Sequence, residues 1–222
     1  MNIGIIGAGN MGAALARLWA AAGHRVLLSY ARDPRQLQAL AAGLPQARAG
    51  TVAEAVAFGE VLLLAVPYPS LDEVLAEAPA FAGKVLLTCV SGLRPDFSGQ
   101  TTGLPSPRTE SVAEEIARRL PGAQVVEAFN TTFAEVLQAP SRQLGGETPS
   151  VFYCGDHPAA NAQAAALIAE CGYQPQDAGP LVHARVLETL ATSWVQLAVV
   201  TGLFPLAGLR VLHEVPPTTP PQ

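Results

Sequence analysis

The first thirty residues contain the pattern that most constrains the fold of this chain. A short apolar run over residues 2–6 leads into the sequence GAGNMG at positions 7–12, and residues 13–22 follow in helix-forming alanine and leucine. A second apolar run begins at Arg25. A GxGxxG motif is informative here because it follows a predicted strand and opens a helix within a β-α-β unit. The pattern predicts a dinucleotide-binding turn.

Each glycine of this motif has its own expected role. Gly7 permits the sharp turn, Gly9 lets the backbone approach a pyrophosphate, and Gly12 lets the helix pack closely on the strand. Free amides at the helix start, together with the helix dipole, favour a phosphate. A β-α-β unit that needs glycine only for packing is the alternative interpretation.

The end of the second strand predicts which dinucleotide is bound. NAD-preferring proteins carry an acidic side chain at this position, which binds the adenosine ribose, but this strand ends without one. Arg32 can instead make paired, charge-assisted bonds to a 2′-phosphate, and Arg35 follows closely. Ser29 or Tyr30 can add a hydroxyl. The segment therefore favours NADP over NAD, and an arginine that serves only as a solvated surface charge is the alternative.

Asp33 is the nearest acidic residue, but it follows the strand several positions too late to replace the missing carboxylate. Because Pro34 comes directly after it, Asp33 is expected to begin the next helix.

The rest of the chain alternates strand and helix patterns. Strands are predicted at residues 47–49, 61–66, 84–90, 124–128, 151–154 and 173–176, and helices at residues 34–42, 52–58, 70–76, 112–120, 158–171 and 181–203. Thr51 and Ser111 each precede a glutamate three positions later, which is the signature of a capping box. The alternation predicts an α/β fold, a Rossmann-like doubly wound and mostly parallel sheet, with a short helical C-terminal extension.

Three parts of the chain are expected to have different roles. Residues 1–180 are predicted to form the NADP-binding domain. Residues 181–213 are predicted to form a helical segment on the cofactor cleft or at a dimer interface, and residues 214–222 a disordered tail. Residues 94–109 are rich in Gly, Pro, Ser and Thr, and are interpreted as a lid, a substrate wall or a disordered excursion.

Doubly wound sheets place their ligands at the carboxyl ends of the strands. Asn130, Thr131 and Thr132 follow one such strand and are the first choice for the wall of the acceptor site. A structural role, in which Asn130 bonds its own turn, is the alternative. The predicted cofactor-binding residues are Gly7, Ala8, Gly9, Asn10, Met11, Gly12, Ser29, Tyr30, Arg32, Arg35, Ala65, Val66, Pro67 and Ser91.

Composition excludes several classes of function. The chain has 222 residues and a net charge of −5, which argues against nucleic-acid or anionic-membrane binding. No apolar stretch is long enough to span a bilayer, and the N-terminus has no charged leader, so a cytoplasmic protein is expected. Cys89, Cys154 and Cys171 are scattered, which indicates free thiols and no metal site. Arg185 and Glu188 are spaced for an intrahelical ion pair.

The chain resembles the NADP-dependent oxidoreductases that work with a deazaflavin coenzyme, and is similar to the cytosolic part of the six-transmembrane ferric reductases. The resemblance is carried by residues 7–12, 66–67, 108–120, 128–131, 153–156 and 177–181, with Arg185 and Glu188 beyond. It implies NADP(H), a second ring cofactor such as deazaflavin, FMN or FAD, and a homodimer. It also implies that Ser29 and Arg32 meet the 2′-phosphate, and that residues 130–132 lie where the nicotinamide meets its acceptor.

Hydride transfer between two rings needs no protein acid or base, which suits a chain with no evident catalytic pair. Two positions depart from the deazaflavin-dependent pattern. Tyr30-Ala31 separates the serine from the arginine, and Asn130 is closer to the ferric-reductase branch.

Other functions remain open at this point. One is a ferric or flavin reductase, another is an imine or carbonyl reductase of the pyrroline-carboxylate type, and a third is a non-catalytic NADP sensor. Many related hydroxyacid enzymes rely on a lysine in a helical domain, whereas the only lysine here is Lys84, before a strand.

Overall fold

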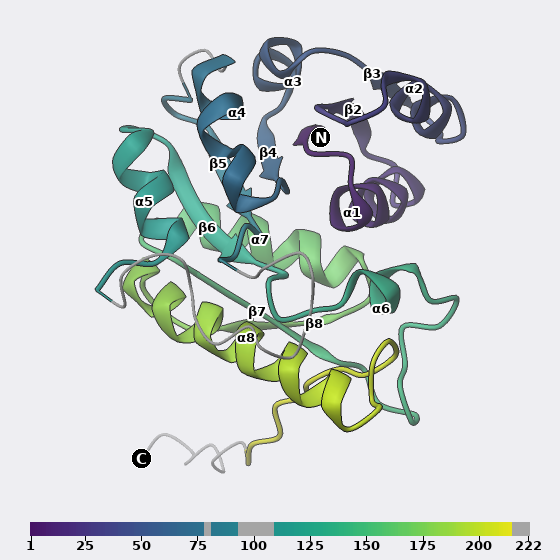
Figure 1. Ribbon diagram of the computed structural model, residues 1–222, viewed down its shortest axis with the longest axis vertical. Coiled ribbons are helices and arrows are strands. Elements are labelled where there is room, and N and C mark those ends of the chain that lie inside the picture. Colours follow the sequence, from purple (N-terminus) through teal and green to yellow (C-terminus); the bar gives the residue numbers. More distant parts are fainter. Residues whose placement is uncertain (78–80, 93–108, 215–222) are drawn as a thin grey trace, which may run out of the picture.

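The computed structural model describes residues 1–77, 81–92 and 109–214, which form one sheet covered by helices on both faces (Figure 1). The strands are β1 Asn2–Ile6, β2 Arg25–Ser29, β3 Ala47–Ala49, β4 Val61–Leu64, β5 Val85–Thr88, β6 Gln124–Ala128, β7 Ser150–Gly155 and β8 Gln174–Asp177. The α-helices are α1 Asn10–Ala21, α2 Pro34–Ala42, α3 Val52–Phe58, α4 Leu71–Glu77, α5 Val112–Arg119, α6 Ala134–Gln138, α7 Pro158–Glu170 and α8 Ala184–Val200. Two 3-10 turns precede helices: η1 Tyr68–Ser70 and η2 Leu181–His183.

The sheet has eight strands in the order β3-β2-β1-β4-β5-β6-β7-β8. Every pair is parallel except β6 and β7, which run antiparallel. Ile6 pairs with Ser29 on one side and with Leu64 on the other, so β1, β2 and β4 end at the same edge. The predicted doubly wound, mostly parallel α/β fold is confirmed, and the chain reversal after β1 brings the glycine turn to this edge.

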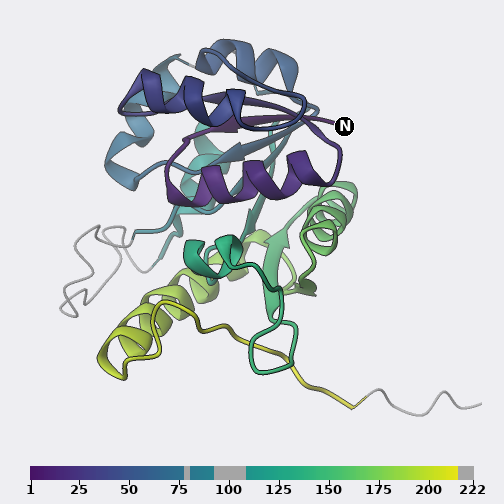
Figure 2. The same ribbon diagram turned by 90° about the vertical axis from the view of Figure 1, so that its right-hand side faces the viewer.

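Two apolar layers hold the helices to the sheet. Side chains of α1, α2, α6 and α7 pack with the strands into one core, which includes Trp19 and Phe129. Side chains of α3, α4, α5 and the start of α8 form the second core on the opposite face. Figure 2 shows α1 and α7 beside the sheet, with α8 extending away from its lower part. Because helices cover both faces of the sheet, the central strands contain continuous apolar runs.

Both predicted capping boxes are present. The Thr51 hydroxyl accepts from the Glu54 amide at the start of α3, and the Ser111 hydroxyl accepts from the Glu114 amide at the start of α5. In each case the glutamate side chain accepts in return from the amide of the capping residue. Asp33 caps α2 as expected, since its carboxylate accepts from the Arg35 amide.

Several element boundaries differ from the predictions. β4 ends at Leu64 and not at residue 66, because the chain turns toward Pro67 at that point. The predicted helix over residues 181–203 begins as the turn η2 and is α-helical only over Ala184–Val200. The short helix α6 was not predicted, because five residues are too few to establish a helical period.

Two of the predicted segments lie mostly outside the residues that the structure describes. Almost all of residues 94–109 and of the tail 214–222 lie outside the described residues.

Candidate functional site

The glycine turn has the geometry that its sequence predicts. Gly7 has φ 109°, and a Cβ there would lie 2.3 Å from the Ala65 carbonyl oxygen, so only glycine fits. A Cβ at Gly12 would lie 1.8 Å from the Gly7 carbonyl oxygen, which holds α1 against the turn. A Cβ at Gly9 would meet no atom within 4 Å. The turn is therefore closed by packing at its two ends and open at its middle.

The start of α1 opens onto this space. Gly9 is the N-cap residue, and no side chain caps the helix. The first turn of α1 carries no acidic residue. Because the first amides of a helix have no partner within it, and the helix dipole is positive at this end, the position suits an anion.

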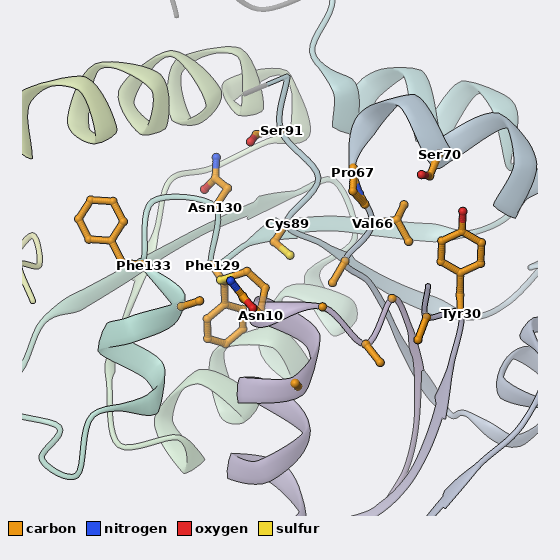
Figure 3. A pocket seen from close by; sticks show the side chains of 18 of the residues that line it. Asn10, Tyr30, Val66, Pro67, Ser70, Cys89, Ser91, Phe129, Asn130 and Phe133 are labelled. Atoms are coloured by element: carbon orange, nitrogen blue, oxygen red, sulfur yellow. The ribbon is translucent and has the colours of Figure 1, made fainter. Parts of the chain in front are cut away.

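A cleft of ≈ 1220 Å³ follows the carboxyl edge of the sheet, with the glycine turn near its middle. Figure 3 shows Tyr30 toward one end and Asn130 and Phe133 toward the other, with Asn10 between them. The predicted site residues that line this cleft are Gly7, Ala8, Gly9, Asn10, Met11, Tyr30, Arg32, Ala65, Val66, Pro67, Ser91, Asn130, Thr131 and Thr132.

Three predicted cofactor-binding residues do not line the cleft. Ser29 is fully buried, and its hydroxyl donates to the Ile5 carbonyl at 2.9 Å, so it does not face the cleft. Gly12 is buried beneath the turn, where its role is packing. Arg35 is exposed in the first turn of α2, outside the cleft wall.

The end of the cleft near β2 carries cationic and hydroxyl groups. Arg32 is exposed there, and the Tyr30 hydroxyl donates to the Glu73 carboxylate at 3.0 Å. Tyr30 has φ 55°, a left-handed conformation that is uncommon for an aromatic residue. Arg17 and Gln36 also line this region, and sequence reasoning did not select them.

The other end of the cleft contains polar atoms without partners. The Asn130 carboxamide, the Thr131 hydroxyl and the Trp194 indole N–H are buried, and within the described structure none of them has a hydrogen-bond partner. Asn130 extends toward Ser91 in Figure 3. Unsatisfied buried polar groups are rare in folded proteins and occur at binding and catalytic sites. The alternative in which Asn130 bonds its own turn is therefore not what the structure contains.

Aromatic side chains form the apolar part of this end. Phe133 and Trp194 are stacked, with ring centroids 5.9 Å apart. The rings of Phe133 and Phe204 are nearly perpendicular, with their centroids 5.3 Å apart. Phe129, directly before Asn130, has φ 66° and is fully buried against Trp19. Two aromatic residues with left-handed backbone, Tyr30 and Phe129, thus directly follow β2 and β6 at the site. Such strained positions cluster where function requires them.

Cys89 lines the cleft, and burial raises the pKa of its thiol to about 12. The thiol is therefore protonated at neutral pH and is not a nucleophile. Among the described residues, no three His, Cys, Asp or Glu side chains gather in an arrangement that could hold a metal ion.

A pair of buried acids lies on the opposite face of the sheet. Glu127 of β6 and Glu188 of α8 are both fully buried, and Glu188 accepts from the Ala113 amide at 3.2 Å. Burial, and for Glu127 also the neighbouring Glu188, raises the pKa of both carboxyls, to about 7 for Glu188. The predicted intrahelical pair is wrong: Arg185 instead binds the Glu114 carboxylate with two bonds of 2.6 and 2.7 Å.

The chain is similar to known oxidoreductases. Residues 2–92 match the model of the family described as NADP oxidoreductase, coenzyme F420-dependent. The matched segment contains the glycine turn and the strands β1 to β5. The predicted resemblance and the prediction of an NAD(P)-dependent oxidoreductase family are confirmed.

Two curated relatives of this chain are similar to it over a longer stretch. Metalloreductase STEAP3 of Rattus norvegicus is 30% identical over 208 residues, which are 91% of this chain and 40% of the relative. A glycerol-3-phosphate dehydrogenase [NAD(P)+] of Azorhizobium caulinodans is 33% identical over 179 residues, 70% of this chain and 53% of the relative. This chain thus spans about half, or less, of the length of these curated relatives.

A solved structure agrees with the family. A crystal structure from Arthrobacter sp. FB24, provisionally described as an F420-dependent NADP-reductase, superposes with a TM-score of 0.82 at 29% identity. The match covers 95% of this chain and 99% of that one. Among the described residues, no helix has both the length and the apolar character needed to cross a membrane.

Proposed function

We propose that this protein binds NADP(H) in the cleft and transfers hydride between NADP(H) and a second ring cofactor, such as a deazaflavin, FMN or FAD. The observation that carries the proposal is the cleft itself. It connects an open glycine turn at the start of α1 with a polar and aromatic wall that contains Asn130 and Phe133.

The residues around the turn fit a dinucleotide. Gly9 leaves room for a pyrophosphate beside the uncapped start of α1, a space that a larger side chain would fill. Arg32 lines the cleft after β2, where an NAD-preferring protein would carry an acid. The residues proposed to hold NADP(H) are Gly7, Ala8, Gly9, Asn10, Met11, Tyr30, Arg32, Ala65, Val66, Pro67 and Ser91.

When bound, NADPH supplies the hydride, and a flat ring can receive it directly without a protein acid or base. The work of this chain is then to hold the two reactants in contact and exclude water, which lowers the entropic part of the barrier. Asn130, Thr131 and Thr132 line the cleft where we expect the nicotinamide and its acceptor to meet. The protonated Cys89 thiol does not compete as a nucleophile.

The proposed acceptors draw on the family description and on one relative. The family description names coenzyme F420, a deazaflavin, and the STEAP3 relative is described as a metalloreductase. A ferric reductase is therefore the second candidate. The imine or carbonyl reductase alternative has less support, because Lys84 lies at the amino end of β5, where its ammonium donates to the Gly59 carbonyl at 2.7 Å.

We also propose a cytoplasmic location, since Cys89, Cys154 and Cys171 are unpaired.

The test is NADPH oxidation by the purified protein with separate acceptors: oxidised F420, FMN, FAD, ferric citrate and a cyclic imine. Turnover with F420 or a flavin supports the proposal. Turnover with the imine alone contradicts the ring acceptor, and turnover with ferric citrate in the absence of added flavin supports the second candidate. Binding of NADPH without turnover of any acceptor indicates the non-catalytic sensor.

A further inference from the structure

Three polar groups at the acceptor end have no hydrogen-bond partner among the described residues. The Asn130 carboxamide and the Thr131 hydroxyl lie in the turn after β6, and the Trp194 indole N–H comes from α8. Leaving a buried donor or acceptor unsatisfied costs about 1–3 kcal/mol. By contrast, the indole N–H of the other tryptophan, Trp19, donates to the Leu167 carbonyl.

Trp194 differs from the other two groups in what it can recognise. An indole N–H is a donor only, whereas a hydroxyl and a carboxamide can both donate and accept. Trp194 therefore discriminates, because it is satisfied only by an acceptor atom. Its ring also stacks on Phe133, which makes a second, edge-to-face ring contact with Phe204. This packing restricts the orientation of the indole, and hence of its N–H.

The aromatic surroundings indicate the kind of molecule that would bring such an atom. Phe133, Trp194 and Phe204 all line the cleft, and flat apolar rings favour another flat ring through stacked or edge-to-face contact. A hydrated metal chelate would bury charge against these rings without compensation. A planar ring with a carbonyl oxygen at its rim satisfies both the apolar surfaces and the unpaired donor.

We propose that Trp194 determines the specificity for the acceptor, by donating a hydrogen bond from its indole N–H to a carbonyl oxygen of a planar ring. This inference rests on the proposed function and adds to it a residue of α8, more than 180 positions after the glycine turn. Trp194 is a binding residue in this account, and Asn130 and Thr131 are the remaining polar partners of the same ligand.

The experiment compares two flat three-ring probes that differ in their carbonyl groups. Lumiflavin carries ring carbonyls, and phenazine has none. Each is titrated calorimetrically into the full-length protein saturated with NADP⁺, using the wild type, Trp194→Phe and Ser193→Ala. Trp194→Phe keeps an aromatic ring and removes the N–H. Ser193→Ala is the control, since it removes an exposed hydroxyl from the adjacent residue of the same helix.

Loss of one neutral hydrogen bond is expected to weaken lumiflavin binding by about tenfold in Trp194→Phe. Phenazine binding is expected to change by less than about twofold, and Ser193→Ala to bind both probes as the wild type does. Equal lumiflavin affinity in the wild type and Trp194→Phe would overturn the inference, as would an equal loss for both probes. A wild type that binds NADP⁺ but not lumiflavin also overturns it. A wild type that binds neither NADP⁺ nor NADPH overturns the proposed function instead.

Discussion

Arg32 is the residue on which the proposed nucleotide preference depends. Its guanidinium is exposed at the cleft, while Arg35, three residues on, lies outside the cleft wall. We expect Arg32→Ala to weaken NADPH binding by tenfold or more, because a charge-assisted pair with the 2′-phosphate is worth about 1.5–3 kcal/mol. NADH binding should change little. Calorimetric titration of both nucleotides measures this difference.

Arg35→Ala is the matched control for Arg32, since it removes the same charge from the same surface. It is expected to bind NADPH within about threefold of the wild type, because salt screens an exposed charge that does not contact the phosphate. If Arg35→Ala has the larger effect, the cleft wall described here does not hold the phosphate. Ser29→Ala gives a further check, because a hydroxyl bonded to Ile5 should affect stability and leave nucleotide affinity unchanged.

The buried acids Glu127 and Glu188 predict an unusual dependence of stability on pH. Their pKa values are raised in the folded protein, to about 7 for Glu188, so the folded state binds more protons than the unfolded state above about pH 4.5. Stability should therefore fall as pH rises from about 5 to 8, by about 1.4 kcal/mol per pH unit for each retained proton. Thermal melts across this range measure the slope.

Glu188→Gln removes one titrating group of this pair and should flatten the decline. Glu60→Gln removes an exposed carboxylate and should leave the slope as in the wild type. A wild type that becomes more stable between pH 5 and pH 8 would contradict the buried pair.

The same region shows a limit of sequence reasoning. The spacing of Arg185 and Glu188 suggested a pair on one helix face, but Arg185 binds Glu114 and Glu188 lies beside Glu127, and both of these glutamates come from other elements.

At the scale of elements, two glycines of the turn between β1 and α1 have different roles: Gly12 is needed for packing, and Gly9 for the proposed binding of the nucleotide. Gly12→Ala places a methyl group 1.8 Å from a backbone oxygen, so we expect a loss of about 3 kcal/mol or more in the free energy of unfolding. Gly9→Ala meets no atom within 4 Å, and its N-cap backbone, φ −74°, suits alanine. It should remain within about 1 kcal/mol of the wild type.

Gly9→Ala should affect nucleotide binding and not stability. Gly9→Ala is expected to fold and to lose at least tenfold in NADPH affinity, because the new methyl group occupies space beside the pyrophosphate. Chemical denaturation and calorimetry on the same samples test both parts. Unchanged nucleotide affinity in Gly9→Ala would contradict the position assigned to the pyrophosphate.

The sequence predicted elements well where the physical signal is local. The β-α-β unit and the capping boxes at Thr51 and Ser111 depend on residues within a few positions of one another. The boundaries were predicted less well where tertiary contacts decide them. Apolar residues continue to Val66, but β4 ends at Leu64 because Ala65 and Val66 turn to line the cleft.

At the scale of the whole molecule, the site combines segments far apart in the sequence. Trp194 and Phe204 reach the cleft from the C-terminal third, although the sequence shows them only as part of an apolar helical pattern. No local spacing connects them with Asn130 or with the glycine turn. Residue types alone could therefore predict the end of the cleft at the glycine turn but not its aromatic end.

The predicted homodimer remains a prediction, with one feature of the structure in its favour. Val186, Leu197 and Val200 are exposed to 63, 53 and 72% and lie along one side of α8. Burying such a stripe against a second copy would remove it from water. Light scattering should give the mass of two chains for the wild type and of one chain for Val186→Glu. A monomeric wild type would contradict the prediction.

The central claim is that the glycine turn and Arg32 form a cradle for a dinucleotide with a 2′-phosphate. Calorimetric titration of the wild-type protein with NADPH and NADH under identical salt and pH tests it most directly. The account predicts that NADPH binds at least tenfold more tightly than NADH. Equal affinity for the two nucleotides, or binding of neither, would contradict it.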